Sequence, residues 1–393
     1  MIDWLMLALL LVAVALGYWL GWRTQKSLAR EPDTGVQAHY IRGLNYLLNE
    51  QQDAAIDTFI VALDVNAETL ETHLALGNLL RKRGEVGRAI KIHQNLLARP
   101  GLSVEHAQQV QLELARDYVS SGLLDRAETL LQELVEDAPP AMRAVCLEYL
   151  IEIYRDEKEW LKAIAAVNQL ASRRFSRLPE QWRVMQGHFY CELAAEALVR
   201  ADYLVVRRHL RSALVSDKQS ARSNLLLAEL EGLLGRHAEA IKALRQIPQQ
   251  EPAYIGEALP LLYERHQVLG SLPSLHRYLR GLVDEYPQSS VVLMLAELVA
   301  QDEGESAAVS FIAERMQAAP TLRGVGQMLS LQLSDAAQSS GVVSEGILAA
   351  DSLIRGLQRQ APNYRCRACG FSGKQMHWLC PGCKTWGSVR GIE

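Results

Sequence analysis

The sequence has little net charge, almost no strand-forming pattern before residue 363 and none of three common catalytic motifs. Its 393 residues carry a formal net charge of −4, which argues against a chain built mainly to grip nucleic acid. It contains no HExxH, GxxxxGK[ST] or GxSxG motif. Gly324-Val325-Gly326 lies in a helical pattern, without the strand that a dinucleotide site requires. We therefore predict that the chain is not an enzyme.

A helical hairpin of tetratricopeptide type runs from about Glu71 to Leu97. A small residue stands at Gly77, a turn is marked by Gly84, and a second small residue follows at Ala89. Two antiparallel helices approach closely only where the side chains at their crossing are small. The spacing therefore predicts two helices that cross at these small positions.

The same pattern recurs along the chain at spacings near 34 residues. Further copies contain the pairs Gly43 and Ala55, Ala115 and Ala127, Ile151 and Ala163, Ala194 and Val206, and Ala228 and Ala240. Degenerate copies follow at 270–287 and 308–320, and helical patterns cover 322–336 and 344–360. Because such hairpins stack on their neighbours, we predict an all-α tetratricopeptide-repeat superhelical solenoid over residues 36–361, with about eight to nine hairpins.

A stacked array of this type binds partners along its concave groove. In the register set by Gly77 and Ala115, the side chains of Asn78, Arg81 and Arg116 project toward that groove. They would hold a peptide backbone or a carboxylate through charge-assisted hydrogen bonds. Ordinary solvent-facing polar residues are the alternative interpretation.

A long apolar run opens the chain. Residues 4–22 contain no charged side chain, and as a helix they would span about 28 Å, close to the roughly 30 Å hydrocarbon core of a bilayer. The alternative is a cleaved signal peptide, but the run is too long and no basic residue precedes it. We predict a transmembrane helix at 1–22 and a linker at 23–35. Aromatic residues at both ends fit the membrane interfaces: Trp4, Tyr18, Trp19 and Trp22.

The charges that flank this run set its predicted orientation. Basic residues follow it at Arg23, Lys26 and Arg30, so the positive-inside rule places the N-terminus outside and residues 23–393 in the cytoplasm. Within the run, small residues recur every four positions and would permit close contact with a partner helix in lipid: Ala13, Gly17 and Gly21.

Four of the six cysteines form two CxxC pairs in the tail. Cys366 and Cys369 make the first pair, and Cys380 and Cys383 make the second. Two residues between thiolates let both sulfurs reach one ion, and two facing pairs complete a tetrahedral tetrathiolate site. Four thiolates leave no open position for a substrate, so the site is predicted to be structural. We predict a small tetracysteine metal domain at 362–393, holding iron or zinc.

The environment of this metal domain can also be predicted. The connection at 360–364 is short, and the aromatic rings of Trp378 and Trp386 need to be buried away from water. We therefore expect the domain to fold back onto the last helices. The remaining cysteines, Cys146 and Cys191, lie in helical patterns and are expected to be buried apolar residues. Two other uses of the tail stay open: electron transfer through tetrathiolate iron, and RNA binding by a ribbon on a repeat scaffold.

The tail phrases CRACGF and CPGC resemble the knuckles of rubredoxin, although the distance between them is far shorter. The whole order of apolar N-terminal run, repeat array and terminal YRCRxCGF…WxCPxCxxW segment resembles the lipopolysaccharide assembly protein B family of Gram-negative bacteria. The resemblance implies that Cys366, Cys369, Cys380 and Cys383 hold one metal ion. The ion is iron in the family's usual description, and zinc fits this sequence equally well.

The resemblance further implies a regulator at the cytoplasmic face of the bacterial inner membrane. Members of the family promote degradation of the deacetylase that commits carbon to lipid A. The protease is a membrane-anchored AAA+ metalloprotease, and the span would contact it or an inhibitory membrane partner. The family also gathers other lipopolysaccharide-synthesis enzymes, and no nucleic-acid partner is expected.

Overall fold

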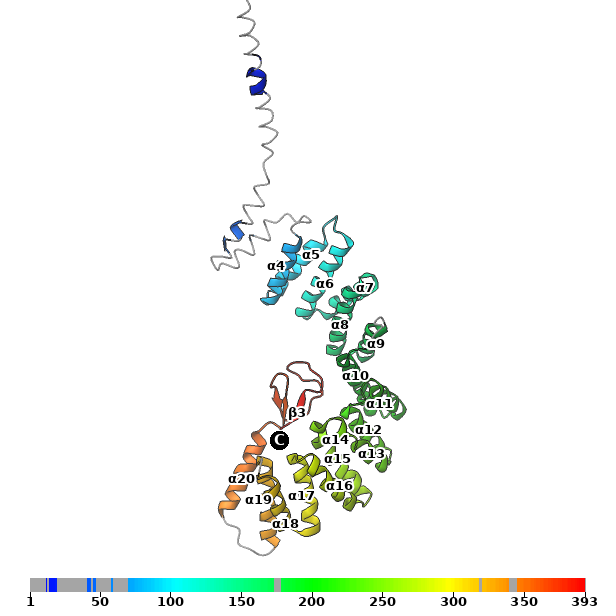
Figure 1. Cartoon of the computed structure of the whole chain (residues 1–393), viewed down its shortest axis with the longest axis vertical. Helices are drawn as coiled ribbons and strands as arrows, with labels where there is room; N and C mark the ends of the chain where they lie inside the picture. Colours follow the sequence, from blue (N-terminus) through cyan, green and yellow to red (C-terminus); the bar gives the residue numbers. More distant parts are fainter. Residues whose placement is uncertain are drawn as a thin grey trace, which may run out of the picture. The chain divides into compact units, whose positions relative to one another are not determined.

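The computed structural model describes a helical chain that ends in a small β-ribbon (Figure 1). The described residues are 12, 14–19, 41–43, 45–46, 58, 70–172, 178–317, 320–338 and 345–392. They divide into two compact units, which meet in the sequence between Ile153 and Tyr154.

Helices of the first unit pair as hairpins, α4 with α5 and α6 with α7. The predicted small residues lie at their crossings: Gly77 is buried, and Ala89, Ala115 and Ala127 are fully buried. The predicted hairpin pattern is therefore confirmed here. The bounds are α4 Leu70–Lys82, α5 Val86–Leu97, α6 Val104–Ser120, α7 Leu124–Asp137 and α8 Pro140–Asp156, the last of which runs on into the second unit.

The second unit continues the series of paired helices. Its helices are α9 Trp160–Ser172, α10 Glu180–Val199, α11 Tyr203–Ser216, α12 Ala221–Leu233, α13 His237–Leu244, α14 Ile247–Gln250, the 3-10 helix η1 Pro252–Tyr254, α15 Ile255–Val268, α16 Leu272–Glu285, α17 Ser289–Glu303, α18 Glu305–Arg315, α19 Leu322–Gln338 and α20 Glu345–Gln360. The last two helices match the patterns predicted at 322–336 and 344–360.

Small and aliphatic residues fill the core of the second unit, as the repeat pattern predicts. Ala194, Val206, Ala228 and Ala240 are all buried between paired helices. Cys191 is also fully buried, as Cys146 is in the first unit. Both cysteines therefore behave as the small apolar residues that we expected.

The C-terminal ribbon is a three-stranded antiparallel sheet of strand order β2-β1-β3. Strand β1 (Tyr364–Cys366) lies at the centre, between β2 (Ser372–Gly373) and β3 (Val389–Gly391). Tyr364 pairs with Gly373 on one side and Gly391 on the other. Throughout the described part of the chain, no strand precedes Tyr364, so the fold is all-α up to this ribbon.

Most of the predicted transmembrane helix at 1–22 lies outside the described residues, as do the linker at 23–35, Ala13, Gly21 and Ala55. Residues 14–19 are helical and include Gly17, around which a Cβ atom would meet no neighbour. Across the described ranges, no helix is both long enough and apolar enough to cross a membrane.

Candidate metal centre

The two CxxC pairs form matching turns at the edge of the ribbon. The amide of Gly370 donates to the carbonyl of Cys366 at 3.0 Å, and the amide of Lys384 donates to the carbonyl of Cys380 at 2.9 Å. Gly370 and Lys384 both have left-handed backbone conformations, with φ of 79° and 56°. Each turn thus closes in the same way and presents its two thiols on one side.

The four thiols converge on one point. Their sulfur atoms all lie within 4.8 Å of one another. Sγ of Cys366 lies 3.7 Å from that of Cys383, and Sγ of Cys369 lies 3.7 Å from that of Cys380. A tetrahedral ion with metal–sulfur bonds of about 2.3 Å needs sulfur atoms about 3.8 Å apart. The residues therefore fit one tetrathiolate metal ion, and a set of four sulfurs suits zinc and iron alike.

Hydrogen bonds around the cluster favour the thiolate form at two of the four positions. The pKa of Cys366 is lowered to about 6, first by the hydrogen bond with the Ser388 hydroxyl at 3.2 Å and then by backbone amides. Hydrogen bonds with the side chain and backbone of Thr385 lower the pKa of Cys383. At Cys369 the backbone amide of Phe371 acts in the same direction, but desolvation and the other thiols raise the pKa to about 12.

Trp386, three residues after the last cysteine, attaches the ribbon to the helices. Its ring stacks on His188 of α10, with ring centroids 4.8 Å apart and an interplanar angle of 13°. Trp386 also makes edge-to-face contacts with Trp160 of α9 and Phe189 of α10, with ring centroids 6.2 and 6.0 Å apart. Because aromatic side chains bury large areas, this cluster is a strong anchor.

A second aromatic contact lies beside the first. Trp378 packs on Tyr254 of η1 with ring centroids 4.6 Å apart. The Arg222 guanidinium of α12 lies over the rings of both Trp378 and Trp386, at 5.4 and 5.7 Å. The Tyr254 hydroxyl donates to the carbonyls of Gly387 and Val389 at 3.2 and 3.3 Å. The ribbon is therefore held through both its rings and its backbone.

Polar pairs surround these aromatic contacts. Arg390 of β3 forms an ion pair with Glu251 and lies over the ring of Tyr254, at 4.0 Å from the ring centre. The Tyr364 hydroxyl donates to Glu257 of α15 at 2.9 Å. The expected docking of the metal domain is confirmed, but its expected location was wrong. The ribbon packs mainly on α9 to α15, because the aromatic partners of Trp378 and Trp386 lie there and not on the last helices.

Comparison with known proteins decides the family. Residues 364–390 match the family described as rubredoxin metal binding domain. Over 389 residues the chain is 32% identical to lipopolysaccharide assembly protein B of Escherichia coli (strain K12), covering 99% of this chain and 98% of the relative. The chain belongs to the lipopolysaccharide assembly protein B family. The protein of the same name from Haemophilus influenzae (strain ATCC 51907 / DSM 11121 / KW20 / Rd) is 31% identical over 397 residues, with the same coverage.

Membership of the lipopolysaccharide assembly protein B family confirms the resemblance seen in the tail phrases. Among solved structures, a tetratricopeptide repeat protein from Parabacteroides merdae ATCC 43184 is similar to this chain. The identity is 13%, the TM-score is 0.34, and the match covers 68% of this chain and all of the other.

The residues predicted to line the groove, Asn78, Arg81 and Arg116, make hydrogen bonds within the first unit. Arg81 donates to Glu113 and Asp117 of α6 at 2.7 Å each and to Asn78 at 2.6 Å. Arg116 donates to Glu113 at 2.5 Å. The two bonds from Arg81 to Glu113 and Asp117 link α4 to α6, while the other two lie within one helix. The donors of Arg81 and Arg116 are therefore used at least partly within the unit.

Sequence reasoning missed His188, although it stacks on the ring that anchors the ribbon. It is buried, and desolvation, followed by the charges of Arg222 and Arg390, lowers its pKa to about 3. His188 lies in the phrase GHFYC of a helix with apolar residues all round, and nothing local marks it as a ribbon contact. His377 packs edge-to-face against Phe371, with ring centroids 6.1 Å apart, and is not part of the four-thiol cluster.

Proposed function

We propose that this protein is a non-catalytic adaptor of the bacterial inner membrane that regulates lipopolysaccharide biosynthesis. In this proposal it promotes degradation of the committed lipid A deacetylase by the membrane AAA+ metalloprotease, and it gathers other lipopolysaccharide-synthesis enzymes. The observation that supports this proposal most directly is the relationship to lipopolysaccharide assembly protein B over 99% of this chain. Stacked helical hairpins, which serve other proteins as binding surfaces, support an adaptor.

The membrane topology is part of this proposal. Residues 1–22 form a single span, the N-terminus is periplasmic, and residues 23–393 are cytoplasmic. The linker at 23–35 joins the span to the repeat array at 36–361. Tethering near a membrane protease raises the effective concentration of a bound client, so a weak client contact suffices. We propose two partner contacts. One is the face of the span that carries Ala13, Gly17 and Gly21, and the other is the face of the array that carries Asn78, Arg81 and Arg116.

The metal domain at 362–393 has a structural role in this proposal. Cys366, Cys369, Cys380 and Cys383 would hold one zinc or iron ion, which cross-links the two CxxC turns. That cross-link fixes the positions of Trp378 and Trp386. Since both rings pack on helices of the second unit, the metal supports a surface made jointly by ribbon and array.

The test is the half-life of the deacetylase in cells that express the chain with or without residues 1–22 at native abundance. The shortened variant is expected to leave the deacetylase long-lived. Replacing the span with an unrelated single-pass helix of the same orientation is the matched control for tethering alone. If the variant without a span restores normal turnover, the tethered adaptor is the wrong interpretation. A pull-down that recovers RNA or redox enzymes, and neither protease nor deacetylase, would favour the other uses of the tail.

A further inference from the structure

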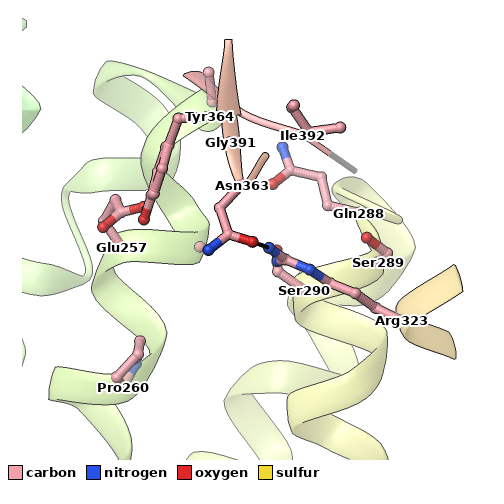
Figure 2. Close-up of a pocket in the computed structure, with 12 residues that line it drawn as sticks. Glu257, Pro260, Gln288, Ser289, Ser290, Arg323, Asn363, Tyr364, Gly391 and Ile392 are labelled. Carbon is pink, nitrogen blue, oxygen red and sulfur yellow. Dashed lines mark hydrogen bonds between the residues drawn. The ribbon is translucent and has the colours of Figure 1, made fainter. Parts of the chain in front are cut away.

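A cavity of about 200 Å³ lies where the ribbon meets the helices, apart from the four thiols. The ribbon side is formed by Asn363, Tyr364, Gly391 and Ile392 (Figure 2). The helix side comes from the starts of α15, α17 and α19. The helix dipole places partial positive charge at the start of each helix, so this side of the cavity favours negative charge, although the amides of Ile255 and Gly324 already donate within the chain.

Arg323 supplies a positive charge to the cavity. Its guanidinium donates to Oδ1 of Asn363 at 3.0 Å, and no ion pair of Arg323 occurs within the described ranges. A guanidinium has five N–H donors in a planar fork that matches a carboxylate. Arg323 therefore keeps donors for a bound anion.

Ser289, the first residue of α17, adds a hydroxyl that lacks a partner. Its residue is only 8% exposed, it lines the cavity, and its hydroxyl has no hydrogen-bond partner among the residues that the structure describes. The helix begins without a side-chain cap. The hydroxyl is therefore available to donate a hydrogen bond to a ligand oxygen at this point of the cavity.

The charges around the cavity distinguish one kind of anion from another. Glu257 lines the wall on the other side of Asn363 from Arg323 (Figure 2), where it accepts the Tyr364 hydroxyl at 2.9 Å. A phosphate dianion would meet one cation and one carboxylate, which is unfavourable. A carboxylate with an adjacent N–H fits better, because Arg323 balances its charge and the free lone pairs of Glu257 accept its N–H.

A second hollow of about 170 Å³ adjoins the first and shares Arg323, Asn363 and Ile392 with it. It adds mainly apolar walls from Leu322, Ala361 and Pro362. A ligand with its carboxylate at Arg323 could place an apolar side chain in this second hollow. The two hollows together suit the last residue of a polypeptide.

We propose that this pair of hollows binds an α-carboxylate with its adjacent N–H and an apolar side chain, as found at the carboxyl end of a polypeptide. A free apolar amino acid offers the same chemistry. Other recognition domains capture the carboxyl ends of chains with clusters of backbone N–H groups. This binding site requires neither the membrane span nor the protease, so it can be tested independently of the adaptor role.

The experiment uses the full chain in detergent and peptides anchored through their N-termini, with the last three positions varied. Peptides with a free carboxylate and an apolar last residue are expected to be retained, and their C-terminal amides to bind at least about tenfold more weakly. Competition with leucine and with inorganic phosphate shows whether the site prefers a peptide end, a free amino acid or a phosphate. Displacement by leucine at low concentration would assign the site to a free amino acid, which keeps the proposed chemistry.

Two variants and a matched control locate the binding. Arg323→Gln is expected to weaken the free-acid peptides at least about tenfold, and Ser289→Ala about threefold. Arg315→Gln removes the same charge from an exposed position outside the cavity and is expected to change nothing. Equal binding of acids and amides, undiminished binding to Arg323→Gln, or displacement by phosphate alone would each overturn the proposal.

Discussion

His188 shows how a single buried side chain can make the ribbon contact sensitive to pH. Its pKa of about 3 means that the ring is neutral in the folded protein under ordinary conditions. In the unfolded chain a histidine takes up its proton near pH 6.5. Between these two values the unfolded state binds more protons, so the free energy of unfolding falls as the pH falls.

Replacing His188 with phenylalanine should remove this pH dependence. A phenyl ring keeps the stacking on Trp386 and eliminates Nδ1, which is buried and has no hydrogen-bond partner among the described residues. We expect the wild type to lose about 1–2 kcal/mol more than His188→Phe between pH 6.5 and 5, since each pH unit is worth about 1.4 kcal/mol. Urea unfolding of the full chain at several pH values measures the difference. If the free energy of unfolding depends on pH equally in the two proteins, His188 is protonated in the folded protein.

At the scale of elements, the pair α4 and α5 depends on the absence of a side chain at Gly77. A Cβ atom there would lie 2.3 Å from Nε2 of His93. The imidazole cannot easily retreat, because it is fully buried and its Nδ1 lies 2.5 Å from Asp117 of α6. Arg81 contacts the same carboxylate, so a shift of His93 would disturb the links among three helices.

Gly77→Ala is therefore expected to destabilise the hairpin by about 1–3 kcal/mol, the usual range for overpacking. Gly87→Ala, in the exposed first turn of α5, is the matched control, because its Cβ would meet no neighbour. This control should leave stability unchanged or raise it by up to about 1 kcal/mol. Hydrogen exchange over α4 to α6 in the full chain measures both variants. If the two substitutions have the same effect, the helices are not held as close at Gly77 as the structure indicates.

Gly77 also shows why the hairpins could be predicted and the ribbon contact could not. Helix packing requires small residues at regular intervals, so Gly77 and Ala89 leave a pattern that one sequence reveals. The four cysteines are likewise visible because metal geometry fixes their spacing. Trp386 and its partners Trp160 and His188 belong to segments far apart in the chain, and aromatic packing imposes no spacing between them. The sequence therefore predicts that Trp386 needs cover, but not which helix provides it.

At the scale of the whole molecule, the ribbon connects the end of the chain to helices far earlier in the sequence. Its contacts include Trp160 of α9, Tyr254 of η1 and Glu257 of α15, and these contacts depend on a segment of only 364–391. Such a short sheet with few apolar residues folds only when its metal ligands are bridged. Loss of the metal should therefore destabilise helices of the second unit as well as the ribbon.

Cys366→Ser is expected to abolish stoichiometric metal binding and to raise hydrogen exchange in α10, α12 and η1, besides the ribbon itself. The physical reason is that Phe189, Arg222 and Tyr254 lose the rings of Trp378 and Trp386 that cover them. Helices α4 to α7 serve as the internal control, because no ribbon residue is needed for their hairpin pairing. His377→Ala is the matched variant within the ribbon and should keep both metal and protection, since His377 is not one of the four thiol positions. Exchange that rises in the ribbon alone would mean that the second unit is complete without it, and the metal domain would then be an appendage instead of part of the binding surface.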